Sequence, residues 1–392
     1  MSILALLSIL IALFWLLATV DGLRGLRTIG ELPEDRLLPK EPPLVSVILT
    51  AKEEEDSIRD TVRHLLDQDY PRLEIIAIND RSRDGTGTRL DELRRWSEGK
   101  RELEINLRVI HITALPEGWL GKNHALYQGY LQSRGSYLLF TDADVRFHRS
   151  AIRKAVAYAL GGGIDHLTLS PYLRARSYAL RSFIHFFLFA FSLAVRPWRS
   201  NDDNSRRQGM GIGAFNLVSR TAYEAIGTHA ALKLRADDDL ELGNRLKRSG
   251  SRQRLLSAYR LLEVEWYRSL KEAVHGFEKN MFAGFRYSTL LALLGCLGLG
   301  LIFIVPVLGL LLAPNLYLKL IFAASLLAQG YLYARCVKAL SPYSASDVWM
   351  LPWNALLMMG VIVRTVVLTL KQGGMYWRGT FYSLRDLKRM RE

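Results

Sequence analysis

The sequence confines its longest uncharged runs to its two ends, and this partition limits what the chain can fold into. Residues 288–313 form 26 consecutive uncharged positions, and residues 1–20 carry no charge either. About 20 apolar residues in a helix are enough to cross the hydrocarbon core of a bilayer. We therefore predict membrane helices at both ends of the chain, with a water-exposed block between them.

The N-terminal run is predicted to be a retained anchor over residues 1–20. It lacks the basic start and the small-residue exit of a signal peptide, which is the alternative interpretation. Arg24 and Arg27 follow it closely, and the positive-inside rule then places residue 21 onward in the cytoplasm. We expect an integral protein of the plasma (inner) membrane with its central block in the cytoplasm.

The C-terminal membrane region is predicted over residues 288–370, but its topology is in conflict. Two shorter apolar runs, 320–334 and 348–363, could span with snorkelling ends or form a re-entrant pair. Four full spans would put the tail, residues 371–392, outside the cell. That tail carries six basic and two acidic residues, so we expect that one segment does not fully cross.

A third apolar patch, residues 183–195, lies between Arg181 and Arg196. Its 13 residues are too few for a span and favour a helix lying in the membrane interface. A helix buried in a protein core is an equally good interpretation.

The charge balance points to an anionic partner. Lysine and arginine number 52 and aspartate and glutamate 38, a net charge of +14. Such an excess favours phosphate esters, nucleic acid or an acidic lipid surface. The two cysteines, Cys296 and Cys336, both lie in apolar tracts, so a disulfide or zinc framework is not expected.

The central block, residues 40–287, alternates short β-branched runs with helical patterns, which is typical of an α/β fold with a mostly parallel sheet. Ligands of such sheets bind at the carboxyl ends of the strands. We predict strands at 44–50, 73–79, 107–112 and 137–140, and helices at 54–67, 86–96 and 123–133.

Acidic residues follow three of these strands: Glu53, Asp80, and the pair Asp142 and Asp144. A rim of carboxylates argues against a nucleic-acid groove and suggests a divalent cation that bridges to phosphates. The block contains no G-x-G-x-x-G or P-loop fingerprint after a strand and no G-x-S-x-G elbow. A glycine-rich stretch at residues 209–213 follows a polar loop and is predicted to be a flexible substrate loop.

Residues 67–86 (DQDYPRLEIIAINDRSRDGT) resemble a motif of the family 2 glycosyltransferases, which have the GT-A fold. The resemblance covers roughly residues 44–287. It implies that Asp80 holds the nucleotide base or ribose and that Glu53 holds the nucleoside. Lys122, in a stretch that resembles the sugar-nucleotide helix of the family, is then a donor contact.

The same resemblance assigns the metal and the base. Asp142 and Asp144 match the family's D-x-D motif and would bind Mg²⁺ or Mn²⁺, with Asp144 as the direct ligand. Residues 236–243 (ADDDLELG) resemble the family's acidic pair, which makes Asp238 and Asp239 the catalytic pair and Asp239 the general base. An N-terminal helix cap would also explain this acidic cluster.

The N-terminal anchor, the C-terminal spans and residues 116–122 (PEGWLGK) resemble the membrane-bound subset that includes ceramide glucosyltransferase and hopanoid-associated transferases. The chain lacks that subset's Q-x-x-R-W motif and offers only Phe285, Arg286 and Tyr287 in its place. Long-polymer synthesis is therefore not expected, and Arg286 is predicted as a donor contact.

The resemblance implies an inverting, metal-dependent hexosyltransferase with one N-terminal and about three C-terminal membrane helices. It would move a sugar from a UDP- or GDP-sugar to a lipid acceptor at the membrane surface, with no nucleic-acid partner. The alternatives are a polyprenyl-phosphate sugar synthase, a catalytically inactive membrane scaffold and, less favoured, a nucleotidyltransferase.

Overall fold

The structure, a computed structural model, describes residues 3–34, 36–99, 105–377 and 380–389. Its contacts divide the chain into two compact units. The sheet unit comprises Ile29–Leu173 and Pro197–Glu265, and the helical unit comprises Met1–Thr28, Arg174–Arg196 and Trp266–Glu392. Both units are therefore built from segments that are distant in the sequence.

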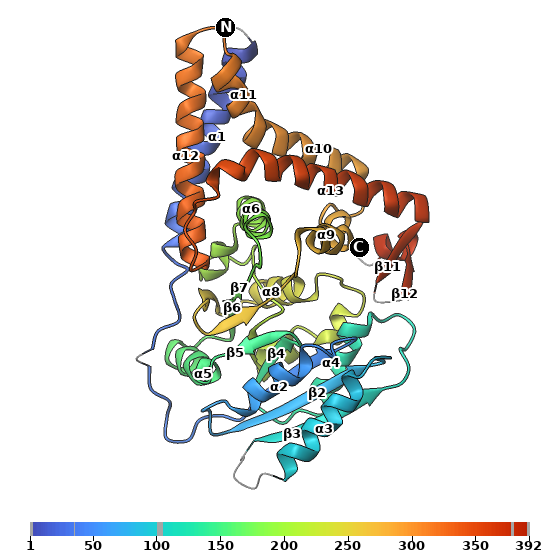
Figure 1. Cartoon of the computed structure of the whole chain (residues 1–392). Helices are drawn as coiled ribbons and strands as arrows, with labels where there is room; N and C mark the ends of the chain where they lie inside the picture. Colours follow the sequence, from blue (N-terminus) through green and yellow to red (C-terminus); the bar gives the residue numbers. More distant parts are fainter. Residues whose placement is uncertain (1–2, 35, 100–104, 378–379, 390–392) are drawn as a thin grey trace. The chain divides into compact units, whose positions relative to one another are not determined.

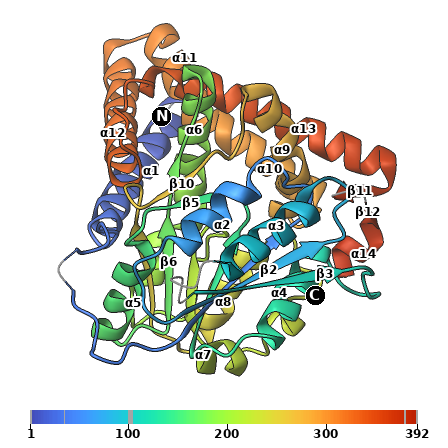
Figure 2. The same ribbon diagram turned by 60° about the horizontal axis from the view of Figure 1, so that its bottom comes forward.

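The sheet unit is built on a seven-stranded sheet with the order β3-β2-β1-β4-β8-β6-β9. The neighbours pair in parallel except β8, which is antiparallel to both β4 and β6. A smaller sheet has the order β5-β10-β7 (Figures 1 and 2). The strands are β1 (Val45–Ala51), β2 (Leu73–Asp80), β3 (Asn106–Ile112), β4 (Tyr137–Asp142), β5 (Val145–Phe147), β6 (His166–Ser170), β7 (Tyr172–Leu173), β8 (Asn216–Ser219), β9 (Gln253–Ser257) and β10 (Leu262–Val264).

The predicted α/β fold and its first four strands are confirmed, because β1 to β4 lie within two residues of the predicted positions. Every residue of β1 and β2 is buried, as expected for β-branched runs covered on both faces. The α-helices of this unit are α2 (Ile58–Leu66), α3 (Thr86–Glu98), α4 (Gly121–Leu131), α5 (Ala151–Gly162), α7 (Arg220–Ala225) and α8 (Asp238–Arg248).

The helix α2 begins at Ile58, four residues later than the predicted helix. The preceding residues form a loop that is held by the loop after β2. The backbone N–H of Glu54 donates to Oγ1 of Thr86 at 2.8 Å, and that of Glu55 donates to Oδ2 of Asp84 at 3.2 Å. These side-chain bonds replace helical hydrogen bonds, so the loop after β1 is fixed beside the loop after β2.

The core of the sheet unit positions two helices that carry predicted site residues. Side chains of β1, β2, β4 and β8 pack with Ala125 and Leu126 of α4 and with Leu242 and Leu246 of α8. This packing fixes the N-terminal ends of α4 and α8, where Lys122, Asp238 and Asp239 lie.

The helical unit contains five helices that are long and apolar enough, by length and composition, to cross a membrane among the described residues. Its helices are α1 (Ile3–Leu26), α6 (Tyr178–Val195), α9 (Leu270–Gly284), α10 (Thr289–Leu299), α11 (Val305–Leu312), α12 (Leu316–Leu340), α13 (Leu351–Gln372) and α14 (Leu384–Arg389). A hairpin of β11 (Gly374–Trp377) and β12 (Thr380–Ser383) follows α13.

Three helices of this unit extend beyond the uncharged runs in the sequence. The helix α6 begins at Tyr178, where the Ser177 hydroxyl caps it by accepting from the N–H of Leu180 at 3.3 Å. It includes Arg181, so its 18 residues exceed the 13 of the predicted patch. The helices α12 and α13 likewise include Lys319, Arg335 and Arg364. Long basic side chains can stay in a helix while their charges reach water.

The predicted 26-residue span is divided into two helices. A π-helical turn, η3 (Gly300–Ile304), separates α10 from α11, and Pro306 follows in the first turn of α11. Such turns and prolines bend helices, and Figure 1 shows α10 and α11 running in different directions.

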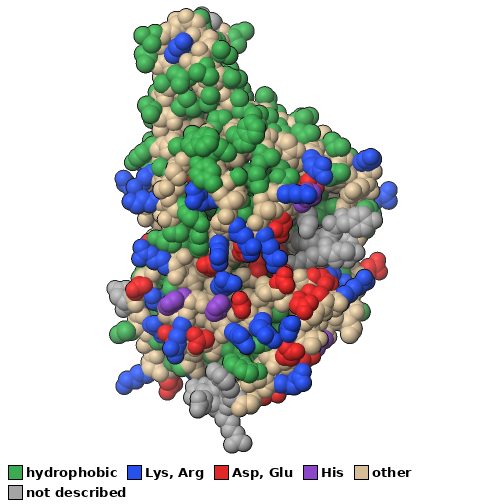
Figure 3. All heavy atoms as spheres, viewed as in Figure 1, with side chains coloured by type: hydrophobic (Ala, Val, Ile, Leu, Met, Phe, Trp, Pro, Cys, Tyr) green, Lys and Arg blue, Asp and Glu red, His purple; other side chains and the backbone are tan. Residues whose placement is uncertain are grey.

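Large apolar side chains cover the outside of the helical unit. On α1, Leu16 and Leu17 are 58% and 60% exposed, and on α12 Leu327 is 74% exposed. In Figure 3 hydrophobic side chains gather over this part of the molecule. A continuous apolar surface of this kind suits lipid and not water.

Candidate active site

The predicted site residues of the sheet unit lie where strands and helices meet at one edge of the seven-stranded sheet. Asp80 and Asp142 end the strands β2 and β4, and Asp144 lies in the turn between β4 and β5. Lys122 is the second residue of α4, and Asp238 and Asp239 are the first two residues of α8. Six of the predicted residues therefore come from strand ends and helix starts.

Lys122 joins the two groups of carboxylates. Its Nζ lies 2.9 Å from Oδ1 of Asp142 and 3.4 Å from Oδ2 of Asp238. Burial opposes the lysine charge, but Asp142, Asp238 and Asp239 outweigh it and hold the pKa of Lys122 above its ordinary value. The lysine is thus a fixed cation between the predicted metal-binding pair and the predicted catalytic pair.

The cluster contains more carboxylates than lysines, and the pKa values of two of these carboxylates are raised. Burial raises the pKa of Asp144, and the charges of Asp142 and Glu54 raise it further. Burial also raises the pKa of Asp238, while Lys122 lowers it. Glu54, which sequence reasoning did not select, therefore contributes to the field at Asp144.

The carboxylate of Asp239 is held by backbone groups. Its Oδ2 accepts from the N–H of Gly213 at 2.8 Å, and its Oδ1 accepts from the N–H of Leu240 at 2.8 Å. Burial raises the pKa of Asp239. The preceding Asp237 instead pairs with Arg235, whose Nη2 lies 2.9 Å from Asp237 Oδ2.

The glycine-rich stretch at residues 209–213 is packed against α8, so the prediction of a flexible loop is wrong. A Cβ on Gly211 would collide with the backbone oxygen of Asp239, and one on Gly213 would collide with Oδ2 of Asp142. The N–H of Gly209 donates to Oδ1 of Asn244 at 3.0 Å, and that of Met210 donates to Oε1 of Gln253 at 2.9 Å. The glycines permit close approach between the loop and the two carboxylates.

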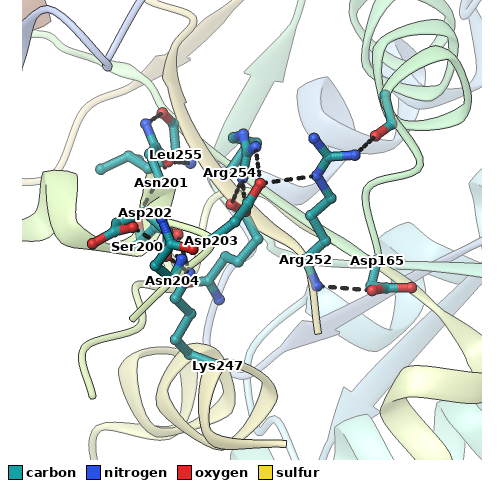
Figure 4. Close-up of polar contacts among 12 residues, drawn as sticks. Asp165, Ser200, Asn201, Asp202, Asp203, Asn204, Lys247, Arg252, Arg254 and Leu255 are labelled. Carbon is teal, nitrogen blue, oxygen red and sulfur yellow. Dashed lines mark hydrogen bonds and ion pairs between the residues drawn. The ribbon is translucent and has the colours of Figure 1, made fainter. Parts of the chain in front are cut away.

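The segment before this glycine loop is fastened to α8 and β9 by a buried lysine and an arginine pair (Figure 4). Lys247 of α8 donates from Nζ to the backbone oxygens of Ser200 and Asp202 at 2.8 and 2.7 Å. Asp203 accepts from Arg252, which precedes β9, and from Arg254 of β9. No sequence motif marked these contacts, because they join residues about 45–50 positions apart.

Asp80 and Glu53 are already engaged by neighbouring residues. Asp80 is only 3% exposed and accepts from Nε and Nη2 of Arg81 at 2.7 and 3.1 Å. Glu53 is exposed, and its Oε1 accepts from the N–H of Arg83 at 3.0 Å. Glu53 and Arg81 both have positive φ, at 56° and 54°, a strained conformation that is common at functional sites.

Gly121 links the Asp80 side of the site to Lys122. A Cβ at Gly121 would collide with Oδ2 of Asp80 and Nη2 of Arg81, so this end of α4 abuts both groups. The N-terminus of a helix carries positive partial charge and free N–H groups that favour anions. The start of α4 can therefore receive a phosphate group between Asp80 and Asp142.

Arg286 lies in the helical unit, between α9 and α10, where its side chain is exposed and its φ is 55°. Its role as a donor contact stays a prediction. Among the described residues, no group of three or more His, Cys, Asp or Glu side chains is arranged to hold a metal ion.

Comparison with known proteins shows the fold of the central part and the family model that it matches. Residues 46–227 match the family model described as glycosyl transferase family 2. A solved mannosyltransferase, PcManGT from Pyrobaculum calidifontis in complex with GDP-Man and Mn²⁺, aligns with a TM-score of 0.53. It is 18% identical, and the alignment covers 94% of this chain and 98% of that one, which shows a shared fold.

Two relatives in sequence carry glycosyltransferase names. A probable glycosyltransferase, YdaM of Bacillus subtilis, is 37% identical over 115 residues, 29% of this chain and 26% of that protein. The 4,4'-diaponeurosporenoate glycosyltransferase of Staphylococcus aureus is 26% identical over 204 residues, 51% of this chain and 50% of that protein. The matches span half or less of these relatives. Residues 46–227 of this chain are similar to the glycosyl transferase family 2 domain, and the sheet unit, to which most of them belong, has the GT-A fold.

Proposed function

We propose that this protein is an inverting, metal-dependent glycosyltransferase that moves a sugar from a nucleotide-diphosphate sugar to a lipid acceptor at the membrane surface. The observation that carries the proposal is the position of Lys122, which pairs with Asp142 and Asp238. The lysine thereby brings a D-x-D pair and an acidic helix start into one cluster. The names of the two relatives, both glycosyltransferases, support transfer of a sugar.

The donor would lie along the edge formed by β2, α4 and β4. Asp80 and Glu53 would bind the nucleoside, and the N-terminus of α4 with Lys122 would face the diphosphate. The mannosyltransferase with the similar fold binds GDP-Man, which supports a nucleotide-diphosphate donor. Since Arg81 occupies both oxygens of Asp80, donor binding would require Arg81 to move or to share its contact.

The D-x-D pair fits a divalent cation, because Asp142 and Asp144 are hard oxygen donors. Burial raises the pKa of Asp144, repulsion by Asp142 and Glu54 raises it further, and a cation would relieve this repulsion. Asp144 and Asp142 would hold Mg²⁺ or Mn²⁺, and the diphosphate and water would complete its ligands. When bound, the metal would neutralise charge on the leaving diphosphate. The mannosyltransferase with the similar fold contains Mn²⁺.

Asp239 would act as the general base toward the acceptor hydroxyl. Gly213 and Leu240 donate to its two oxygens and fix its orientation, while each oxygen keeps a further lone pair for the incoming proton. Its raised pKa makes it a stronger base than an ordinary aspartate. A single base opposite the leaving group implies in-line displacement and inversion at the anomeric carbon.

A lipid acceptor is supported by the apolar helices of the chain. The test is to incubate membranes that contain the full chain with a panel of labelled UDP- and GDP-sugars and to extract the lipid. We expect label from one donor in the lipid fraction, in a bond that resists mild acid. Label in an acid-labile lipid would indicate a polyprenyl-phosphate sugar synthase, and release of free sugar alone would contradict the proposal.

A further inference from the structure

Strand pairing and side-chain contacts indicate which of the apolar helices cross the membrane. They also indicate on which side of the membrane the helix ends lie. The helix α6 connects strands of one sheet, because β6 precedes it and β8 follows it. These strands pair directly, with His166 opposite Val218 and Leu167 opposite Leu217. A helix that crossed the bilayer would separate two paired strands. Although it is long and apolar enough, α6 therefore does not cross.

The end of α13 lies on the same side as the end of α9. Tyr287, three residues beyond α9, donates from its hydroxyl to Sδ of Met375 in β11 at 3.7 Å, and both residues are buried. The segment between the last strand of the sheet unit and Tyr287 contains α9, which is not a candidate span. Tyr287 and Met375 therefore both lie on the side of the sheet unit. The chain between them crosses the membrane an even number of times.

Among the three candidate segments, namely α10 with α11, α12 and α13, an even number means that two cross or none does. Since α12 packs along the candidate span α1, two of them cross. The helices α1, α11 and α12 pack beside one another, and Figure 1 shows α13 running across α1 and α12 instead of along them. The helix α13 packs along α9, and its Arg364 pairs with Glu278 of α9. The helix α9 also exposes Lys271, Glu272 and His275, and such a charged helix is not stable in hydrocarbon. The segment that does not cross is therefore α13.

The outer face of α13 fits the acyl region of one leaflet. Its exposed large apolar side chains recur at intervals of three, four or seven residues, which places them on one face of the helix. They are Trp353, Leu356, Val363, Val367 and Leu370, each 49–64% exposed. The opposite face is buried against the protein, including Asn354, Thr365 and Thr369. One face in lipid and one on protein is the pattern of a helix that lies in the interface.

We propose that α13 lies in the plane of the cytoplasmic leaflet, with its Trp353–Leu370 face in lipid, and does not cross the bilayer. The chain then crosses three times, through α1, through α10 with α11, and through α12. Lys371, Arg385 and Lys388 then lie on the same side as the sheet unit. This arrangement removes the topological conflict in the sequence, because positive charge then stays on the cytoplasmic side.

The depth of α13 in the membrane tests this proposal. Spin labels are placed at Leu356→Cys, Val363→Cys and Leu370→Cys, in a full chain that carries Cys296→Ala and Cys336→Ala, in phosphatidylcholine and phosphatidylglycerol vesicles. A spanning helix would separate positions 356 and 370 in depth by about 21 Å, at 1.5 Å per residue. We expect depths that agree within a few Å. Labels at Leu320→Cys and Tyr331→Cys of α12 are the control and should differ by about 16 Å.

The side of the tail is tested independently with a membrane-impermeant thiol reagent on sealed vesicles. Lys371→Cys should react from the same side as Lys40→Cys, and Pro314→Cys, in the turn between α11 and α12, from the opposite side. All three positions are exposed. Reaction of Lys371→Cys from the side of Pro314→Cys, or a depth difference across α13 like that across α12, would overturn the proposal.

Discussion

At the scale of single residues, the cluster around Lys122 depends on which carboxylate faces which partner. Asp238 faces the lysine, and Asp237 faces Arg235. Asp239 faces the backbone N–H groups of Gly213 and Leu240. Three consecutive aspartates thus have three different environments, which makes each of them separately testable.

Asp239→Asn should lower turnover roughly 10²–10⁴-fold, the usual contribution of a positioned base, because asparagine cannot accept the proton. Donor affinity should change little, since the donor is assigned to Asp80, Lys122 and the metal. The control is Asp237→Asn, which weakens the partly exposed pair with Arg235 and leaves the proposed catalytic pair in place. Turnover and donor binding are measured for both variants. An inactive Asp237→Asn beside an active Asp239→Asn would show that the assignment of the pair is wrong.

The close contacts of Gly211 with Asp239 and of Gly213 with Asp142 lead to a second prediction at the residue scale. Gly213→Ala would displace the Asp142 carboxylate, so turnover should fall at least about tenfold with only a small loss of stability. Gly211→Ala would meet the backbone of Asp239, which cannot move freely, so it should destabilise the fold by about 1–3 kcal/mol.

Gly30→Ala is the control for both variants, because a Cβ there meets no atom within 4 Å. Thermal melts and activity assays on the three variants separate the two effects. Equal melting temperatures for Gly211→Ala and Gly30→Ala would refute the close packing of the loop on α8.

At the scale of elements, the sequence predicts the strands better than it predicts the membrane helices. The β-branched runs of β1 and β2 are bounded by polar residues, so their ends are visible in the sequence. The helix α6 is not bounded in this way, because Arg181 lies within it and its cap, Ser177, precedes the apolar run. The number of uncharged residues therefore underestimates a helix whose basic side chains reach water.

The candidate site shows the same limit. Residues that follow strands were predictable, because parallel strands deliver their ends to one edge. The packing of the glycine loop against α8 was not predictable, because it depends on contacts between residues 26 or more positions apart, such as Gly213 and Asp239. Asn123 is a further example, since its Nδ2 donates to the backbone oxygens of Leu232 and Arg235 at 2.6 and 2.9 Å.

The hydrogen bonds that Asn123 donates from α4 predict the effect of Asn123→Ala. The variant leaves buried carbonyls of the segment before α8 without a donor, which should destabilise the sheet unit by about 1–3 kcal/mol. Gln128→Ala on the same helix is the control, because Gln128 is less buried and its side chain has one hydrogen bond, to His124, among the described residues. Denaturant unfolding of both variants measures the difference, and equal stability would contradict a structural role for Asn123.

At the scale of the whole molecule, the helical unit draws on segments from three parts of the chain. The helix α6 packs aromatic rings against later segments, with Phe186 at 5.0 Å from Phe303 and Phe189 at 5.3 Å from Tyr333, between ring centroids. A fragment of residues 40–287 would expose these rings. It should aggregate or lose activity on a lipid acceptor, as measured by size-exclusion chromatography and transfer assays. A soluble, monomeric fragment with full activity on lipid would contradict this expectation.

The most direct test of the account is sugar transfer into lipid by the full chain, measured with and without a chelator of divalent cations. We expect that the chelator abolishes transfer, that Mg²⁺ or Mn²⁺ restores it, and that Asp144→Asn remains inactive with either metal while still folded. Full transfer in excess chelator, or full activity of Asp144→Asn, would contradict the proposed role of the carboxylate cluster.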